Sequence, residues 1–183
     1  MIKFYKNFFN EIDAQLKFTD VVLLEKISQA LKLARLKKKK IIIIGNGGSS
    51  AIASHVSVDL TKNAKIRSIN FNEADLLTCF SNDYGYKKVF SKSLEFYADK
   101  GDVVIIISSS GSSKNLLEAA KVAKKRKLIL FTLTGFSKTN PLKKMGQINL
   151  WVNSKAYNIV ETVHQIWLLS IVDRIIGKME YSS

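Results

Sequence analysis

The sequence predicts a single α/β domain, residues 1–183, in which helices cover both faces of a parallel β-sheet. Three observations support this fold class. Strand-like and helix-like patterns alternate along the chain, the strand-like runs are almost entirely apolar, and no Pro-, Gly- or Ser-rich linker interrupts them. The length of 183 residues also fits one domain. We expect a helical extension at 1–36, the sheet core at 40–153 and a last helix at 158–179.

Two N-terminal helices are predicted from apolar residues that recur every three or four positions. The stripe of the first helix consists of Phe4, Phe8, Ile12 and Leu16. The stripe of the second helix consists of Leu23, Ile27, Leu31 and Ala34. Thr19 or Asp20 is the expected N-cap of the second helix, because a side-chain oxygen at that position accepts hydrogen bonds from first-turn N–H groups.

The rest of the chain alternates between short apolar runs and helical periodicity. The run Ile41 to Ile44, closed by Gly45, is typical of a strand that is buried on both faces. Strands are expected at 41–44, 66–71, 103–107, 128–133 and 148–152. Helices are expected at 49–61, 73–81, 87–98, 112–125 and 158–179.

The composition excludes several classes of protein. A single cysteine, Cys79, excludes an intrachain disulfide framework and a cysteine-based zinc knuckle. The N-terminal residues lack an apolar signal region, and no apolar run approaches 18 residues. We therefore expect a cytoplasmic protein that neither crosses nor binds a membrane. The net charge of +14 suits anionic partners, but the lysines cluster in short runs without a nucleic-acid recognition motif. A basic, solvated surface is favoured over nucleic-acid binding.

Two loops rich in serine and glycine follow predicted strands and precede predicted helices. The first is 45–50 (GNGGSS) and the second is 108–113 (SSSGSS). Ligands of parallel sheets bind beyond the carboxyl ends of the strands. Glycines let the backbone approach a ligand closely, and hydroxyl and N–H groups at a helix N-terminus favour an anion. Two such loops in one sheet predict a phosphate site, although ordinary turns and caps remain the alternative.

Nucleotide motifs fit these loops poorly. A P-loop requires a lysine that neither loop provides. The dinucleotide fingerprint is matched by Gly45 and Gly47, but Ser50 stands at its third position. No acidic residue follows directly after the predicted strand 66–71, where the ribose contact is expected. A nicotinamide enzyme is therefore not favoured.

Three stretches of the chain resemble the sugar isomerase (SIS) domain family. They are residues 45–60 (GNGGSSAIASHVSVDL), 81–86 (SNDYGY) and 107–135 (ISSSGSSKNLLEAAKVAKKRKLILFTLTG). Within the family, the chain is similar to the phosphoheptose isomerases, which act on sedoheptulose 7-phosphate for surface polysaccharides such as lipopolysaccharide or capsule. The resemblance implies a five-stranded parallel sheet, a homotetramer and active sites at subunit contacts. It also implies a phosphorylated sugar as substrate.

The resemblance assigns roles to residues of both loops. The phosphate-binding residues that it implies are Ser49, Ser108, Ser109, Ser110 and Ser113. Further substrate contacts are implied at Asn46, Gly47 and Asp83.

Isomerisation moves a proton between two neighbouring carbons and needs a base and an acid or a metal. His55 and Asp59 stand four residues apart, on one helix face. In the resembled isomerases this pair is His and Glu; the Glu is the base, and both can bind zinc. Asp59 is one methylene shorter, which withdraws the carboxylate by about 1 Å, enough to slow catalysis. A surface pair without function is the alternative.

The last predicted helix departs from the family twice. Glu161 stands where the family has a glutamine, and Leu169 stands where it has the catalytic histidine. Glu161, Gln165 and Leu169 share one helix face, and His164 lies about 60° away. A rebuilt site would use Asp59 and Glu161 as catalytic residues. Zn²⁺ would be held by His55, Asp59, Glu161 and Gln165, with His164 as an alternative ligand or simply a packed, hydrogen-bonded residue.

Two functions remain open. The first is a phosphosugar isomerase with Asp59 as base and Glu161, or a metal-polarised water, as acid. The second is a catalytically silent SIS module that binds a phosphosugar or a protein, as in a replication-initiator-binding homologue of the family that lacks the histidine. We favour the isomerase because a carboxylate is present at both 59 and 161.

Overall fold

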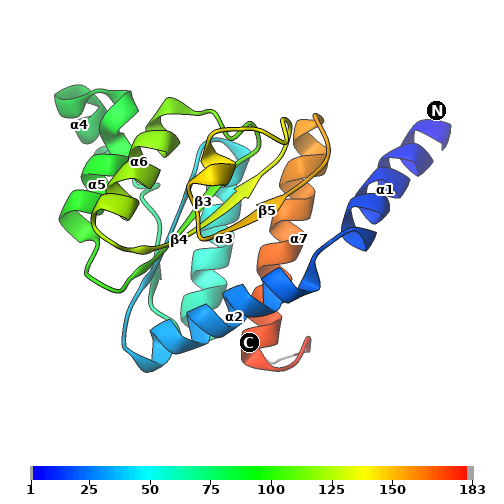
Figure 1. Ribbon diagram of the computed structural model, residues 1–183, viewed down its shortest axis with the longest axis horizontal. Coiled ribbons are helices and arrows are strands. Elements are labelled where there is room, and N and C mark those ends of the chain that lie inside the picture. Colours follow the sequence, from blue (N-terminus) through cyan, green and yellow to red (C-terminus); the bar gives the residue numbers. More distant parts are fainter. Residues whose placement is uncertain (1, 181–183) are drawn as a thin grey trace.

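The computed structural model describes residues 2–180 and contains an entirely parallel sheet between two layers of helices (Figure 1). The strands are β1 (Ile41–Gly45), β2 (Ser68–Ile69), β3 (Val103–Ser108), β4 (Ile129–Thr134) and β5 (Ile148–Trp151). They form one five-stranded sheet in the order β2-β1-β3-β4-β5. The predicted α/β fold class is confirmed.

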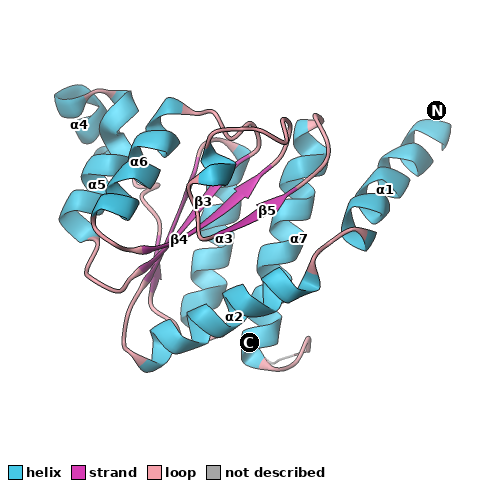
Figure 2. Ribbon diagram, in the orientation of Figure 1, coloured by secondary structure: helices cyan, strands magenta, loops and turns pink. Residues whose placement is uncertain are grey.

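Helices separate the strands, as Figure 2 shows. Between strands lie α3 (Gly48–Lys62), α4 (Ala74–Tyr84), α5 (Val89–Tyr97) and α6 (Lys114–Lys125). Two helices precede the first strand, α1 (Ile2–Lys17) and α2 (Val21–Leu36), and α7 (Tyr157–Ile176) follows the last. Short 3₁₀ helices lie at Tyr86–Lys88 and Leu142–Lys144. No helix within residues 2–180 has the length and apolarity that a membrane span requires.

The isoleucine run of β1 supplies both hydrophobic cores, because successive side chains of a strand point to opposite faces. Ile41 and Ile43 pack with residues of α2, α3 and α7. Ile42 and Ile44 pack with residues of α5 and α6 on the other face. All four isoleucines are fully buried, which explains why the strand is apolar at every position rather than alternating.

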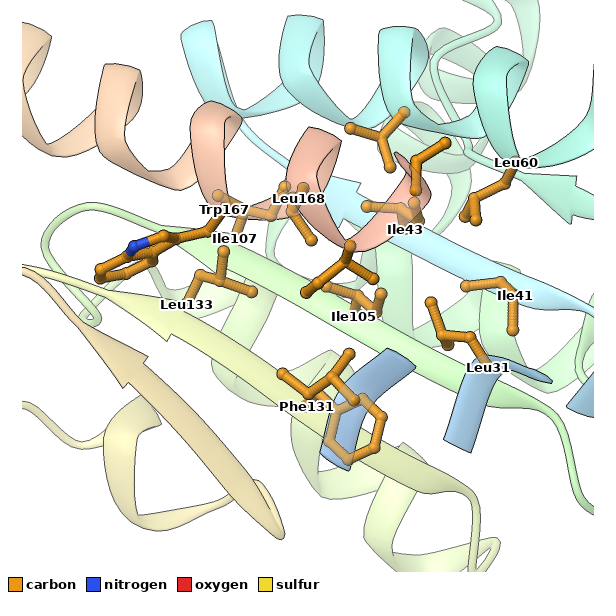
Figure 3. Close-up of a cluster of buried hydrophobic side chains, with 14 of the residues drawn as sticks. Leu31, Ile41, Ile43, Leu60, Ile105, Ile107, Phe131, Leu133, Trp167 and Leu168 are labelled. Atoms are coloured by element: carbon orange, nitrogen blue, oxygen red, sulfur yellow. The ribbon is translucent and has the colours of Figure 1, made fainter. Parts of the chain in front are cut away.

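The larger core lies under three helices that are distant in sequence. Figure 3 shows Leu31 of α2, Leu60 of α3 and Leu168 of α7 with strand residues of β1, β3 and β4. This packing fixes α3 and α7 side by side against the sheet. The amino-terminal halves of both helices consequently lie near the carboxyl ends of the strands, where a ligand site is expected.

The N-terminal helices behave differently from each other. Asp20 is the N-cap of α2, since its Oδ1 accepts hydrogen bonds from the backbone N–H groups of Val22 (3.0 Å) and Leu23 (3.3 Å). Helix α1 has no buried residue and extends away from the sheet in Figure 1. Phe4 and Phe9 are 70% and 63% exposed. Of the predicted apolar stripe of α1, Ile12 and Leu16 are half-buried and pack against the larger core, whereas Phe4 and the neighbouring Phe9 are left uncovered by this chain.

Several predicted elements have different limits in the structure; the helix expected at 73–81, for example, is α4 and ends at Tyr84. The strand expected at 66–71 is reduced to Ser68–Ile69, because β2 is an edge strand that pairs only with β1. The helix expected at 158–179 ends at Ile176, where Gly177 adopts φ +94° and its N–H donates to the Asp173 carbonyl. A left-handed glycine at this position terminates a helix.

Candidate active site

The two serine-glycine loops line one cavity of about 240 Å³ at the carboxyl ends of β1 and β3. These strands are neighbours in the sheet, so the loops that follow them meet. The cavity is lined by Asn46, Gly47, Gly48, Ser49, Ile107, Ser108, Ser109, Ser110, Ser113, Leu116, Tyr157 and Glu161. The structure therefore brings together seven of the eight residues expected to bind substrate, together with Glu161.

Glycines of the first loop permit close packing at the start of α3. Gly47 adopts φ +54°, a conformation that costs glycine little. A Cβ added to Gly45 would overlap Ser49, and a Cβ added to Gly48 would overlap the Glu161 carboxylate. The first turn of α3 consequently lies directly against Glu161 of α7.

One residue of the second loop that lines the cavity, Ser109, has a buried and unpartnered hydroxyl. Ser109 is 5% exposed, and its Oγ has no hydrogen-bond partner among the described residues. Ser113 is the N-cap of α6, but its side chain makes no capping hydrogen bond. Buried polar groups normally have partners, and the N-terminus of a helix carries partial positive charge. A bound anion would satisfy the Ser109 hydroxyl and lie near the start of α6.

Asn46 is held by a hydrogen-bond network that the sequence did not reveal. It exchanges two hydrogen bonds with the Asn115 side chain, at 3.0 and 2.9 Å, and the Tyr86 hydroxyl donates to its Oδ1 at 3.0 Å. Tyr86 belongs to the same segment 81–86 as Asp83, a predicted substrate contact. Asp83 accepts a hydrogen bond from Asn82 and is not among the described residues that line this cavity.

A second cavity, of about 410 Å³, adjoins the first along α3 and α7. His55, Glu161 and Gln165 line it, and Glu161 borders both cavities. Burial raises the pKa of the Glu161 carboxyl above its usual value. Glu161 is thus an ionisable group at the junction between the serine-glycine loops and a larger cavity, with an environment that favours its protonated form.

His55 lies between two hydrogen-bonding side chains. Gln165 Nε2 lies 3.3 Å from His55 Nδ1, and His55 Nε2 lies 3.3 Å from Asp59 Oδ2. An amide nitrogen only donates, so Nδ1 is the acceptor and the ring proton is on Nε2, which faces Asp59. Asn63 donates to the other Asp59 oxygen at 3.1 Å. Asp59 lies one turn beyond His55 on α3 and lines neither cavity in the described part of the chain.

The expected zinc ligands do not converge in this arrangement. Asp59 and Gln165 contact opposite nitrogens of the His55 ring, whereas one metal ion binds one ring nitrogen. Zinc sites require three or four ligands around one point. Among residues 2–180, no group of three or more His, Cys, Asp or Glu side chains is placed to hold a metal ion. The four residues do not fit one zinc ion as they stand, and the zinc expected from the sequence is untested.

His164 and Leu169, the other two α7 residues considered for the site, are directed toward the interior of the protein. His164 is fully buried, and its Nε2 lies 3.1 Å from the Thr134 carbonyl oxygen. Burial lowers its pKa to about 4, so His164 is neutral and Nε2 donates to that carbonyl. Leu169 is half-buried and packs against the larger core. His164 is therefore a packed, hydrogen-bonded residue. It does not take the place of the catalytic histidine that the resemblance implies at the position of Leu169.

Comparison with known proteins identifies a family model, related sequences and a related structure. A family model described as SIS domain matches residues 5–135. A phosphoheptose isomerase of Cytophaga hutchinsonii is 48% identical over 101 residues, which span 52% of this chain and 53% of that enzyme. A phosphoheptose isomerase of Fusobacterium nucleatum is 33% identical over 154 residues, spanning 81% of this chain and 79% of that enzyme. The structure of phosphoheptose isomerase GmhA from Neisseria gonorrhoeae matches with a TM-score of 0.88 at 25% identity, covering 96% of each chain.

These matches include the residues that build the candidate site. The range 5–135 contains both serine-glycine loops and the His55–Asp59 pair. The structural match extends over nearly the whole chain and includes the helical layers on both faces of the sheet. The chain therefore belongs to the SIS domain family, in the group that includes the phosphoheptose isomerases.

Proposed function

We propose that this protein is an aldose–ketose isomerase that interconverts sedoheptulose 7-phosphate and an aldoheptose 7-phosphate, in heptose synthesis for a surface polysaccharide. The named relatives support this reaction class. The observation that carries the proposal is the cavity shared by the two serine-glycine loops, because a buried, unpartnered Ser109 hydroxyl and the Glu161 carboxyl border the same space. The loop that contains Ser109 suits a phosphate, and the Glu161 carboxyl suits proton transfer.

The phosphate end of the substrate would lie between the starts of α3 and α6. N–H groups at both helix N-termini and serine hydroxyls would donate to its oxygens. The serines are Ser49, Ser109, Ser110 and Ser113. Asn46, held by Asn115 and Tyr86, would contact the sugar chain from one side. Fixing the phosphate in this way positions the carbonyl end for reaction, which is a large part of what an isomerase must do.

Glu161 is the proposed general acid. Conversion of the ketose begins when a base removes a proton from C1 while an acid protonates the carbonyl oxygen on C2, which gives an enediol. The enediol then takes up a proton at C2 and loses the O1 proton. Burial favours the protonated form of Glu161, and a protonated carboxyl can donate to the C2 oxygen. Glu161 would thus do what the resemblance assigns to a histidine at the position of Leu169.

Asp59 is the proposed base, with His55 as the group that orients it. The His55 Nε2–H hydrogen bond holds one Asp59 oxygen, and Asn63 holds the other. These two hydrogen bonds fix the orientation of the Asp59 carboxylate. The shorter side chain of Asp59 and its place one turn beyond the cavity predict slow proton abstraction relative to an enzyme with glutamate there.

A homo-oligomer, with a tetramer as the expected form, is part of the proposal. The support is the uncovered apolar surface of α1, on which Phe4, Tyr5 and Phe9 are 70%, 59% and 63% exposed. Contiguous exposed apolar side chains on a projecting helix are typical of an interaction surface. Cytoplasmic location stays a prediction.

Calorimetry with sedoheptulose 7-phosphate tests the phosphate assignment. The double variant Ser110→Ala with Ser113→Ala should bind about 5- to 150-fold more weakly, which corresponds to about 1–3 kcal/mol for hydrogen bonds to a charged group. Ser112→Ala is the matched control, because Ser112 is exposed in the same loop and does not line the cavity. Equal affinity of wild type and the double variant would exclude the assignment. Binding without turnover by the wild type would identify a silent module.

A further inference from the structure

Five cationic side chains line a cavity of about 440 Å³ that is separate from the candidate active site. They are Arg35, Lys38, Lys39, Lys65 and Arg67, and the remaining lining residue is the buried Ile66. Three of the cations come from the end of α2 and the loop that follows it, and two from the segment between α3 and β2. Two segments about 30 residues apart in sequence thus form one concave basic surface.

This basic cavity lies at the opposite end of the sheet from the serine-glycine loops. Its residues precede β1 and β2, whereas the two loops follow β1 and β3. All strands are parallel, so the amino and carboxyl ends form opposite edges. The five residues of β1 separate the two edges by about 16 Å at about 3.3 Å per residue. A ligand in the basic cavity would not contact the candidate active site.

Hydrogen bonds between the two segments hold the basic cavity in shape. Arg35 Nη1 donates to the Ala64 carbonyl at 2.9 Å, and the Arg67 guanidinium donates to the Lys38 carbonyl. The arginine of each segment therefore binds the backbone of the other. Each of these guanidiniums has five N–H donors, so further donors remain for a ligand.

Among the described residues, the cations of the basic cavity are not paired with carboxylates in salt bridges, although Lys39 lies near enough to Asp99 to lower the pKa of that carboxyl. Within residues 2–180, none of its five cations forms a salt bridge. The adjacent Lys40 provides a contrast, because its Nζ lies 2.5 Å from Asp99 and 2.6 Å from Asp102. Like charges held close together repel one another, and a bound anion would remove that cost.

The lining residues indicate the class of anion. Several separated cations match more than one phosphate group, and guanidiniums bind phosphate oxygens in pairs. None of the six residues that line the cavity is aromatic. Single-stranded nucleic acid binds mainly where aromatic side chains stack on bases, so a nucleic acid is the less suitable ligand. A volume of about 440 Å³ lies in the range of small-molecule sites.

We propose that this basic cavity is a second binding site, for a small molecule with two or more adjacent phosphate groups. The site is independent of the isomerase function proposed above. Its ligand could be an inorganic polyphosphate or a nucleoside polyphosphate, because both carry the same chain of phosphates. The site would give the protein a means of responding to such an anion away from the sugar phosphate.

Isothermal titration with tripolyphosphate, on the full-length protein at physiological salt, tests this site. The double variant Lys38→Gln with Lys65→Gln should bind tripolyphosphate at least about tenfold more weakly than wild type. The control Lys124→Gln with Lys125→Gln removes the same charge from the exposed end of α6 and should change the affinity less than about twofold. Circular dichroism of both variants confirms that they fold.

Further titrations separate this site from the phosphate loops and distinguish the ligand. The Ser110→Ala, Ser113→Ala variant should retain tripolyphosphate binding at the basic cavity. Equal affinity for tripolyphosphate and adenosine triphosphate would identify the phosphate chain as the recognised group, and tighter binding of the nucleotide would identify a nucleotide; both support the site. The proposal would be overturned if the Lys38, Lys65 variant and the Lys124, Lys125 control lost equal affinity for tripolyphosphate. Tighter binding of a single-stranded oligonucleotide than of tripolyphosphate would also overturn it.

Discussion

Glu161 lines the cavity proposed to bind phosphate, and the charge of its carboxylate should change the affinity for a sugar phosphate. When ionised, it repels a phosphate held by the two loops, so Glu161→Gln should bind sedoheptulose 7-phosphate more tightly than wild type at pH 8. Glu161 and the serine-glycine loops line one cavity of about 240 Å³, and we take about 6 Å as the separation of two charges held within it. At an effective dielectric constant of about 20 to 40, the repulsion is about 1.4–2.8 kcal/mol per unit charge, or about 10- to 100-fold in affinity.

The difference in affinity between Glu161→Gln and the wild type should depend on pH. Burial raises the pKa of Glu161, and a nearby phosphate raises it further, because both oppose the charged form. The advantage of Glu161→Gln should therefore be greatest at pH 8 and should disappear as the pH falls and Glu161 becomes protonated in the wild type. The phosphate of the ligand also ionises over this pH range, but its effect is the same for both proteins and cancels in the ratio of their affinities at each pH.

Calorimetry between pH 5 and pH 8 provides the measurement. Glu118→Gln is the matched control, because Glu118 lies on α6 outside both cavities and pairs with Lys121. It should leave the affinity unchanged. If Glu161→Gln binds no more tightly than wild type at pH 8, the carboxylate does not share a space with the phosphate, and its role as the acid would lose its basis.

Three other predictions concern stability, assembly and metal. His164 has a folded pKa of about 4 and a usual value of 6.5, so the unfolded chain takes up a proton first as the pH falls; between pH 7 and pH 5 the free energy of unfolding should drop by about 2 kcal/mol from this residue. Urea unfolding of wild type and His164→Gln at both pH values should show that this part of the loss is absent from the variant; an equal loss in both would exclude His164 as its source. Light scattering should give a mass near four times 20.6 kDa for the wild type and a smaller mass for Phe4→Ser with Phe9→Ser, whereas a wild-type monomer would contradict the proposed assembly. Because the donors around His55 do not converge, Zn²⁺ at stoichiometric concentration should bind the wild type no more tightly than His55→Ala; a clear difference would restore the zinc site.

The fold could be predicted because its strands are buried on both faces. A run such as Ile41 to Ile44 has no other stable environment in a chain with polar segments around it. The two loops were also visible, since glycine and serine are concentrated where strands end and helices begin. The limits of β2 were not predictable, because pairing of an edge strand depends on how far its single neighbour extends.

The candidate site was only partly predictable, because its shape depends on how helices cross. Tyr86 and Asn115 bind Asn46 through contacts across 40 and 69 residues, and no local spacing encodes those contacts. The i and i+4 spacing placed His55 and Asp59 together correctly. It did not indicate that Asp59 lies beyond the cavity, whereas Glu161 of α7 borders it, since this depends on the rotation of α3 and α7 against the sheet.

Incorporation of solvent deuterium at C1 of sedoheptulose 7-phosphate, followed by nuclear magnetic resonance, tests the proposed isomerase most directly. This exchange requires the enediol and does not depend on how fast product leaves. We expect the wild type to catalyse it, and we expect Asp59→Asn to abolish it while binding the sugar phosphate with nearly wild-type affinity. Exchange that persists in Asp59→Asn would remove Asp59 as the base. A wild type that binds the sugar phosphate but incorporates no deuterium would contradict the isomerase function itself.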